Sequence, residues 1–118
     1  MRANAMHNCT NPYQTGVEKI LCVCSAGLLR SPTLAGELYK RGFNTRAAGV
    51  HDYALIPVDE VLLKWADTIM FVNKGLREHV TGIEERHQVF VLDIPDRFEW
   101  RHPELVAIIN STLDDLGY

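Results

Sequence analysis

Residues 19–32 read KILCVCSAGLLRSP, and this stretch decides the expected fold. The first six residues form a short, mostly apolar run, which is typical of a strand buried in a parallel sheet. A loop of small residues around Gly27 follows the run. Ser31 and Pro32 then suit the cap and the first turn of a helix. A strand that passes through a short loop into a helix is the opening unit of an α/β domain.

The rest of the chain repeats this alternation. Further strands are expected at 43–48, 68–72 and 88–92, and helical segments begin near Pro57, Lys74 and Pro103. The pattern predicts an open, doubly wound α/β domain, in which a four-stranded parallel sheet is flanked by helices. Ligands bind such sheets beyond the carboxyl ends of the strands. Cys24 and Asp93 both follow strands there, which is a first indication of function.

Apolar spacing predicts the buried faces of the first two helices. The expected core positions are Leu34, Ala35, Leu38 and Tyr39 in the first helix, and Val61, Leu62 and Trp65 in the second.

The chain has 118 residues and a formal net charge of −3, and 47% of its residues are hydrophobic. Residues 1–17 are polar and predict a flexible tail, which leaves 18–118 for a single domain. No basic face indicates a nucleic-acid or membrane partner, and the amino terminus lacks the apolar segment of a secretory signal. Three cysteines predict no disulfide framework, so a reducing cytoplasm is expected. The five His residues are dispersed, which predicts no metal site.

The loop from Cys24 to Ser31 carries the chemistry. Its backbone N–H groups are expected to form a nest for an oxyanion, and the following helix adds positive potential that favours a thiolate at Cys24. Arg30 can grip phosphate with two parallel hydrogen bonds, and Ser31 can donate to the sulfur. The remaining phosphate-binding positions would be Ser25, Ala26, Gly27, Leu28 and Leu29. The loop neutralises phosphate by itself, so no cofactor is expected.

Cys24-x5-Arg30-Ser31-Pro32 directly after an apolar strand resembles the signature of the low-molecular-weight protein tyrosine phosphatases. Similar short matches are Ala48-Gly49, Trp65 to Ile69, and Leu92 to Asp96, so the resemblance covers roughly residues 18–117. It implies that family's four-stranded parallel fold and the hydrolysis of phosphomonoesters through a phosphocysteine.

The sequence also departs from this family. Ala26 and Gly27 stand where the family usually has Gly and Asn, and Leu29 stands where it often has a second Cys that protects the nucleophile. A looser loop and the loss of that redox switch are expected, as in a short, divergent branch of the family.

Two carboxylates are candidates for the general acid that protonates the leaving group. Asp93 lies nearest the strand, whereas the spacing from Asp96 to Phe98 resembles the family's spacing of acid and aromatic, which narrowly favours Asp96. Phe98, Trp100 and Tyr53 would form the rim of the substrate site. The expected substrates are therefore a phosphotyrosine protein or a small aryl phosphate, and vanadate and phosphate should bind the same loop.

Three other functions remain open. A sugar phosphotransferase IIB-like phosphocarrier has a similar loop around its cysteine, but it has a small hydroxyl residue where this chain has Arg30. An arsenate reductase shares the Cys-x5-Arg loop but needs further cysteines, and Cys9 and Cys22 are poorly placed for that role. A non-catalytic phosphoprotein-binding module is the third alternative, because Ala26 and Gly27 alter the loop. The sequence indicates no oligomeric state.

Overall fold

The structure of the chain is a computed structural model, which describes residues 8–9, 17–25, 30–51, 54, 56–95 and 102–118. The strands are β1 (Asn8–Cys9), β2 (Lys19–Cys24), β3 (Asn44–Gly49), β4 (Thr68–Phe71) and β5 (Gln88–Val91). The helices are α1 (Arg30–Lys40), α2 (Glu60–Trp65), the 3₁₀ helix η2 (Lys74–His79) and α3 (Pro103–Leu116). The strands form one sheet in the order β1-β3-β2-β4-β5.

The predicted four-stranded parallel sheet is confirmed, because β3, β2, β4 and β5 all pair in parallel. The sheet also has a fifth strand that the sequence did not predict. Asn8 and Cys9 pair antiparallel with β3, opposite Arg46 and Thr45, within the segment expected to be a tail. A two-residue strand has no periodicity to detect, since its pairing depends on the edge that β3 offers.

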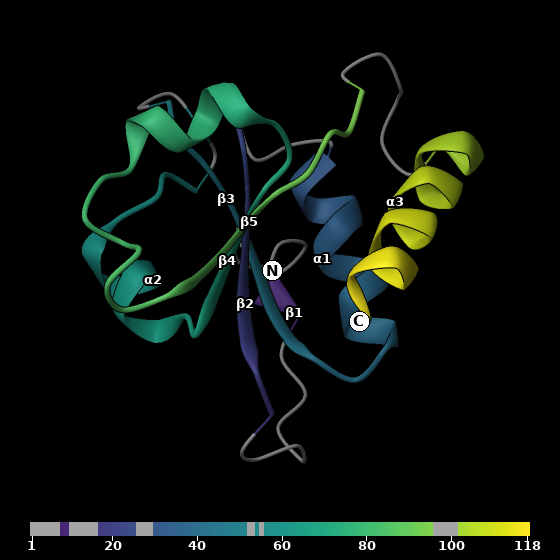
Figure 1. Ribbon diagram of the computed structural model, residues 1–118, viewed down its shortest axis with the longest axis horizontal. Coiled ribbons are helices and arrows are strands. Elements are labelled where there is room, and N and C mark those ends of the chain that lie inside the picture. The colour runs from purple at the N-terminus through teal and green to yellow at the C-terminus, as the bar shows by residue number, and fades with distance from the viewer. Residues whose placement is uncertain (1–7, 10–16, 26–29, 52–53, 55, 96–101) are drawn as a thin grey trace.

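Helices cover both faces of the sheet, as a doubly wound domain requires. Figure 1 shows α1 and α3 side by side on one face, with α2 and η2 on the other. The residues of β2 from Ile20 to Cys24 are almost completely buried between these layers. Their position explains why the run that opens the domain is apolar along its length rather than alternating.

The first helix begins two residues earlier than predicted, at Arg30 rather than at Pro32. Arg30 is already helical, so Ser31 lies inside the first turn of α1 and is not the cap. Gly42 ends this helix as expected: its φ is +99°, and its N–H donates to the Tyr39 carbonyl at 2.9 Å. The side chain of Ser31 is therefore available for a contact outside the helix.

The second helix begins three residues later than predicted. Pro57 forms an isolated bridge with Gly49 instead. Asp59 is the helix cap, because its Oδ1 accepts from the Leu62 N–H at 2.9 Å.

Two residues expected in the core lie at the surface. Tyr39 is 40% exposed near the end of α1, and Val61 is 71% exposed on α2. On α2, Leu62 is buried as predicted and Leu63 is buried in place of Val61, because a helix this short can bury only one narrow stripe. Within the described residues, no helix is both long and apolar enough to cross a membrane.

Candidate active site

Cys24 is the last residue of β2 and is only 3% exposed. Neighbouring strands hold the backbone where β2 ends. The Val50 N–H donates to the Cys24 carbonyl at 3.1 Å, and the His51 N–H donates to the Ser25 carbonyl at the same distance. These bonds extend the β2–β3 pairing past the strand, so the thiol leaves the sheet from a fixed backbone.

The hydroxyl of Ser31 contacts this thiol. Ser31 Oγ lies 3.0 Å from Cys24 Sγ and 3.4 Å from the Ala48 carbonyl oxygen, and all three groups are buried. A hydroxyl has one proton, so it donates either to the carbonyl or to the sulfur. Donation to the sulfur favours a thiolate, and the shorter distance makes it the stronger of the two contacts. The structure thus brings Ser31 to the position predicted for a group that assists the nucleophile.

Arg30 is charged and almost fully buried, at 5% exposure. Its Nη1 donates to the Ile94 carbonyl oxygen at 3.1 Å. Ile94 is itself fixed, since its side chain is buried and its N–H donates to the Val72 carbonyl at 3.0 Å. The bond ties the start of α1 to the segment after β5. A carbonyl is a neutral acceptor, so this contact orients the guanidinium without cancelling its charge.

Sequence reasoning missed the role of Ile94. It singled out the segment from Leu92 to Asp96 for its carboxylates, whereas the hydrogen bond that Arg30 makes to this segment uses a main-chain carbonyl. Every residue has such a carbonyl, so no residue type could have marked this position.

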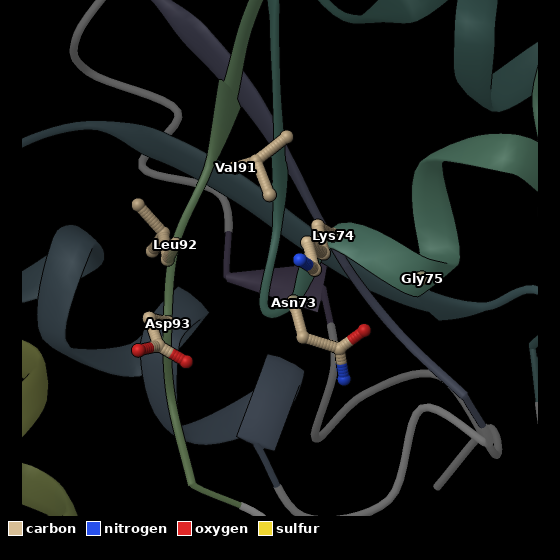
Figure 2. Close-up of a pocket in the computed structure, with 6 residues that line it drawn as sticks. All are labelled: Asn73, Lys74, Gly75, Val91, Leu92 and Asp93. Atoms are coloured by element: carbon tan, nitrogen blue, oxygen red, sulfur yellow. The ribbon is translucent and has the colours of Figure 1, made fainter.

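Asp93 follows the carboxyl end of β5, at the same end of the sheet as Cys24, and its side chain is exposed. Its two neighbours are held by backbone bonds: the Leu92 N–H donates to the Phe71 carbonyl at 2.7 Å, and the Ile94 N–H donates to the Val72 carbonyl at 3.0 Å. Asp93 also borders a pocket, shown in Figure 2, together with residues 73–75 and 91–92. The chain path therefore fixes Asp93 just beyond the carboxyl end of β5.

The structure brings four candidate residues to the end of the sheet where the parallel strands have their carboxyl ends: Cys24, Arg30, Ser31 and Asp93. Ser25 is described as well, through its carbonyl bond to His51. The other candidates lie outside the described residues; they are Ala26, Gly27, Leu28, Leu29, Tyr53, Asp96, Phe98 and Trp100.

Two of the histidines expected to be dispersed lie together. The rings of His51 and His79 pack edge to face, with centroids 5.8 Å apart. Within the ranges that the structure describes, no group of three or more His, Cys, Asp or Glu residues could hold a metal ion. Cys22 and Cys24 are both buried, and neither forms a disulfide.

A parallel sheet with a cysteine at the end of β2, and an arginine and a serine opening the next helix, is the arrangement of the low-molecular-weight phosphatase fold. Solved structures support this class. Wzb of Vibrio vulnificus, in complex with benzylphosphonate, has a TM-score of 0.68 and 22% identity over 86% of this chain and 97% of that chain. The YwlE arginine phosphatase of Geobacillus stearothermophilus has a TM-score of 0.61 and 18% identity over 85% of this chain and 93% of that chain.

A related reductase shares the fold. The thioredoxin-dependent arsenate reductase Cg_ArsC1' of Corynebacterium glutamicum has a TM-score of 0.64 and 15% identity over 87% of this chain and 61% of that chain. No protein-family model matches the sequence, and no curated protein matches it. At these identities the likeness shows the fold, so the expected resemblance is confirmed at that level.

Proposed function

We propose that this chain is a cysteine-dependent phosphomonoester hydrolase that acts through a phosphocysteine. One observation carries the proposal: Cys24 Sγ lies 3.0 Å from Ser31 Oγ, at the carboxyl end of β2, in the loop that ends at the buried Arg30. A nucleophile, a hydroxyl donor and a buried cation at one end of a parallel sheet suit attack on a phosphate dianion.

The reaction has two steps. The Cys24 thiolate attacks phosphorus, the bond from phosphorus to the ester oxygen breaks, and a carboxylic acid gives its proton to the leaving oxygen. Water then attacks the phosphocysteine, its proton returns to the carboxylate, and the phosphorus–sulfur bond breaks to release phosphate and thiolate. Arg30 would hold the equatorial phosphate oxygens, and Ser31 would donate to the departing sulfur.

The acid would be Asp96 or Asp93. The spacing from Asp96 to Phe98 narrowly favours Asp96, whereas Asp93 is held at the sheet edge by the backbone bonds on either side of it. The two assignments are separated by substituting each carboxylate in turn.

The proposed substrates are phosphotyrosine in proteins or small aryl phosphates. The Wzb neighbour binds benzylphosphonate, whose aromatic ring and phosphonate resemble an aryl phosphate. The YwlE neighbour is an arginine phosphatase, so a phosphoarginine peptide belongs among the test substrates.

Arsenate reduction is the second candidate, because the reductase from Corynebacterium glutamicum shares the fold at a TM-score of 0.64. That chemistry needs another thiol to resolve the intermediate. Cys22 is completely buried inside β2, which places it poorly for that role. Thiol-dependent consumption of arsenate, with no release of phosphate from esters, would favour the reductase.

The test is hydrolysis of para-nitrophenyl phosphate without metal and with a reductant. Wild type should turn over, Cys24→Ser should be inactive, and either Asp93→Asn or Asp96→Asn should lose about 10²–10³-fold in kcat. Cys22→Ala is the matched control and should stay active, because Cys22 lies in the core outside the loop. The proposal would be overturned if folded wild-type protein bound vanadate but released no phosphate from any ester. The remaining candidate functions would then be a phosphocarrier and a non-catalytic phosphoprotein-binding module.

A further inference from the structure

A pocket of about 560 Å³ opens beside the candidate active site. One wall is made by residues 73–75, where β4 passes into η2, and the other by residues 91–93 of β5 and its continuation. Figure 2 shows the six side chains or backbones around it: Asn73, Lys74, Gly75, Val91, Leu92 and Asp93. The mechanism above uses only the carboxylate of Asp93 among them.

The pocket lies at the carboxyl ends of β4 and β5, and β4 is the strand next to β2, which ends at Cys24. The Val72 N–H donates at 2.9 Å to the carbonyl of Val23, the residue before Cys24. The Val72 carbonyl accepts at 3.0 Å from Ile94, whose own carbonyl holds Arg30. One wall therefore starts one residue after Val72, and the other ends one residue before Ile94. A substrate that extends from Cys24 along these strand ends toward β5 would reach the pocket.

The side chains around the pocket are of mixed character. Lys74 carries a positive charge and is exposed, Asp93 carries a negative charge on the opposite wall, and Val91 offers an exposed apolar surface. Gly75 has no side chain, and a Cβ there would meet only Asn73 Oδ1, at 3.5 Å, which is an ordinary contact. A simple anion would favour uniformly positive walls, whereas opposite charges and an apolar patch suit a polypeptide.

We infer that this pocket is a subsite for the residue next to the phosphorylated residue of a polypeptide substrate. The inference rests on the proposed function, since it takes the phosphorylated residue to lie at Cys24. An extended chain advances about 3.3–3.6 Å per residue, so a flanking residue reaches the neighbouring strand end. Lys74 would pair with an acidic flanking side chain, and Val91 would pack against its aliphatic part.

The test measures peptide binding without turnover. Cys24→Ser protein is titrated into fluorescent phosphotyrosine peptides that carry either Glu or Lys beside the phosphotyrosine, and anisotropy gives Kd. Lys74→Glu should weaken binding of the Glu peptide about five-fold and leave that of the Lys peptide unchanged or stronger. Gly75→Trp, which adds a large side chain to the pocket wall, should weaken both peptides. Lys64→Glu, the same charge change at an exposed position on α2, is the control and should weaken neither.

Separate readouts distinguish the two ideas. Turnover of para-nitrophenyl phosphate by Lys74→Glu and Gly75→Trp, with Cys24 intact, should stay within two-fold of wild type, because this substrate ends before the pocket. Failure of wild type to hydrolyse any ester would sink the proposed function, yet the peptide Kd values would still test the subsite. The subsite would be overturned if all variants bound the peptides with equal Kd, or if neither peptide bound. It would also be overturned if Lys74→Glu and Gly75→Trp lost as much activity on para-nitrophenyl phosphate as they lost in peptide binding. Melting temperatures confirm that each variant is folded.

Discussion

Two arginines flank α1, one at each end, and their surroundings differ. Arg30 begins the helix at the carboxyl end of the sheet, and its Nη1 donates to a neutral carbonyl, that of Ile94. Arg41 follows the helix at the opposite end. Its Nη1 donates to the Asp114 carboxylate at 2.9 Å and to the Tyr118 carbonyl at 3.1 Å, and its Nη2 donates to Asn110 Oδ1 at 2.7 Å.

The amino end of the sheet supplies its own counter-charges. Besides Asp114 beside Arg41, Glu18 accepts hydrogen bonds from Tyr118 Oη, at 2.6 Å, and from Thr68 Oγ1. The Tyr118 ring packs on Phe43 and on Phe90, with centroids 5.2 and 5.7 Å away. Polar groups that hydrogen-bond to one another beside packed aromatic rings stabilise the fold. Such groups are already paired within the protein, so they are poor candidates for binding a ligand.

The contacts described at the carboxyl end are of a different kind. Its described contacts hold a buried guanidinium against a carbonyl and a thiol against a hydroxyl, and both arrangements suit an added anion. The same residue type thus bonds to α3 just after the end of α1, as Arg41, and is a proposed anion-binding group at its start, as Arg30. The two arginines thus differ in the acceptors described for them: a carboxylate and an amide oxygen for Arg41, and a main-chain carbonyl for Arg30.

The largest effect should follow from Arg30→Lys. Lysine keeps the charge but loses the planar fork that grips two phosphate oxygens, so kcat/KM on para-nitrophenyl phosphate should fall about 10³-fold. Vanadate, which should raise the melting temperature of wild type by mass action, should raise that of the variant much less.

Arg41→Lys is the matched control at the other end of α1. It should lower the free energy of unfolding by about 1 kcal/mol, because contacts to α3 are lost, while kcat/KM stays within two-fold of wild type. If instead Arg41→Lys abolished turnover and Arg30→Lys did not, the contrast between the two ends would be wrong.

A smaller effect is expected from Ser31→Ala. The substitution removes the hydroxyl 3.0 Å from Cys24 Sγ, so kcat should fall about 10–100-fold through both formation and breakdown of the phosphocysteine. Single-turnover kinetics measure the rate at which the phosphocysteine forms, and a burst of released phenol shows whether its breakdown is the slower step. Thr33→Ala, at a neighbouring buried hydroxyl on α1, is the control; an equal loss there would show that the effect comes from packing rather than from the sulfur contact.

The smallest effect should come from Tyr118→Phe, which removes a half-buried hydrogen bond to Glu18. The free energy of unfolding in urea should drop by about 1 kcal/mol at neutral pH, with unchanged turnover.

The same residue predicts a pH dependence. Burial, followed by the hydrogen bond to Glu18, raises the pKa of Tyr118 above its ordinary value. The folded state therefore favours the neutral phenol, so this stabilisation is complete below about pH 10 and is lost as the pH rises further. Wild type should lose stability above that pH more steeply than Tyr118→Phe. Parallel curves for the two proteins would contradict this assignment, and Tyr39→Phe, at an exposed tyrosine, serves as the control.

Much of the fold and the centre of the candidate site were predictable from local sequence. Strand and helix periodicity is a property of consecutive residues, so β2, β4, β5 and α3 could be located without tertiary information. Cys24, Arg30 and Ser31 lie within eight consecutive positions, and the loop that joins a strand to a helix brings them together. A short loop of this kind leaves few arrangements, which is why the spacing predicted the contact between Cys24 and Ser31.

The remaining features were decided by tertiary structure alone. The Arg30–Ile94 bond joins residues 64 positions apart through a main-chain carbonyl, and the Tyr118–Glu18 bond joins residues 100 apart. The strand β1 depends on the free edge of β3, and the exposure of Val61 depends on which stripe of α2 meets the sheet. A sequence pattern records what each residue can do, whereas packing selects which distant group it meets. Local sequence therefore determined the candidate nucleophile and its place after β2, and only the folded chain decided which group Arg30 contacts and what borders the candidate site.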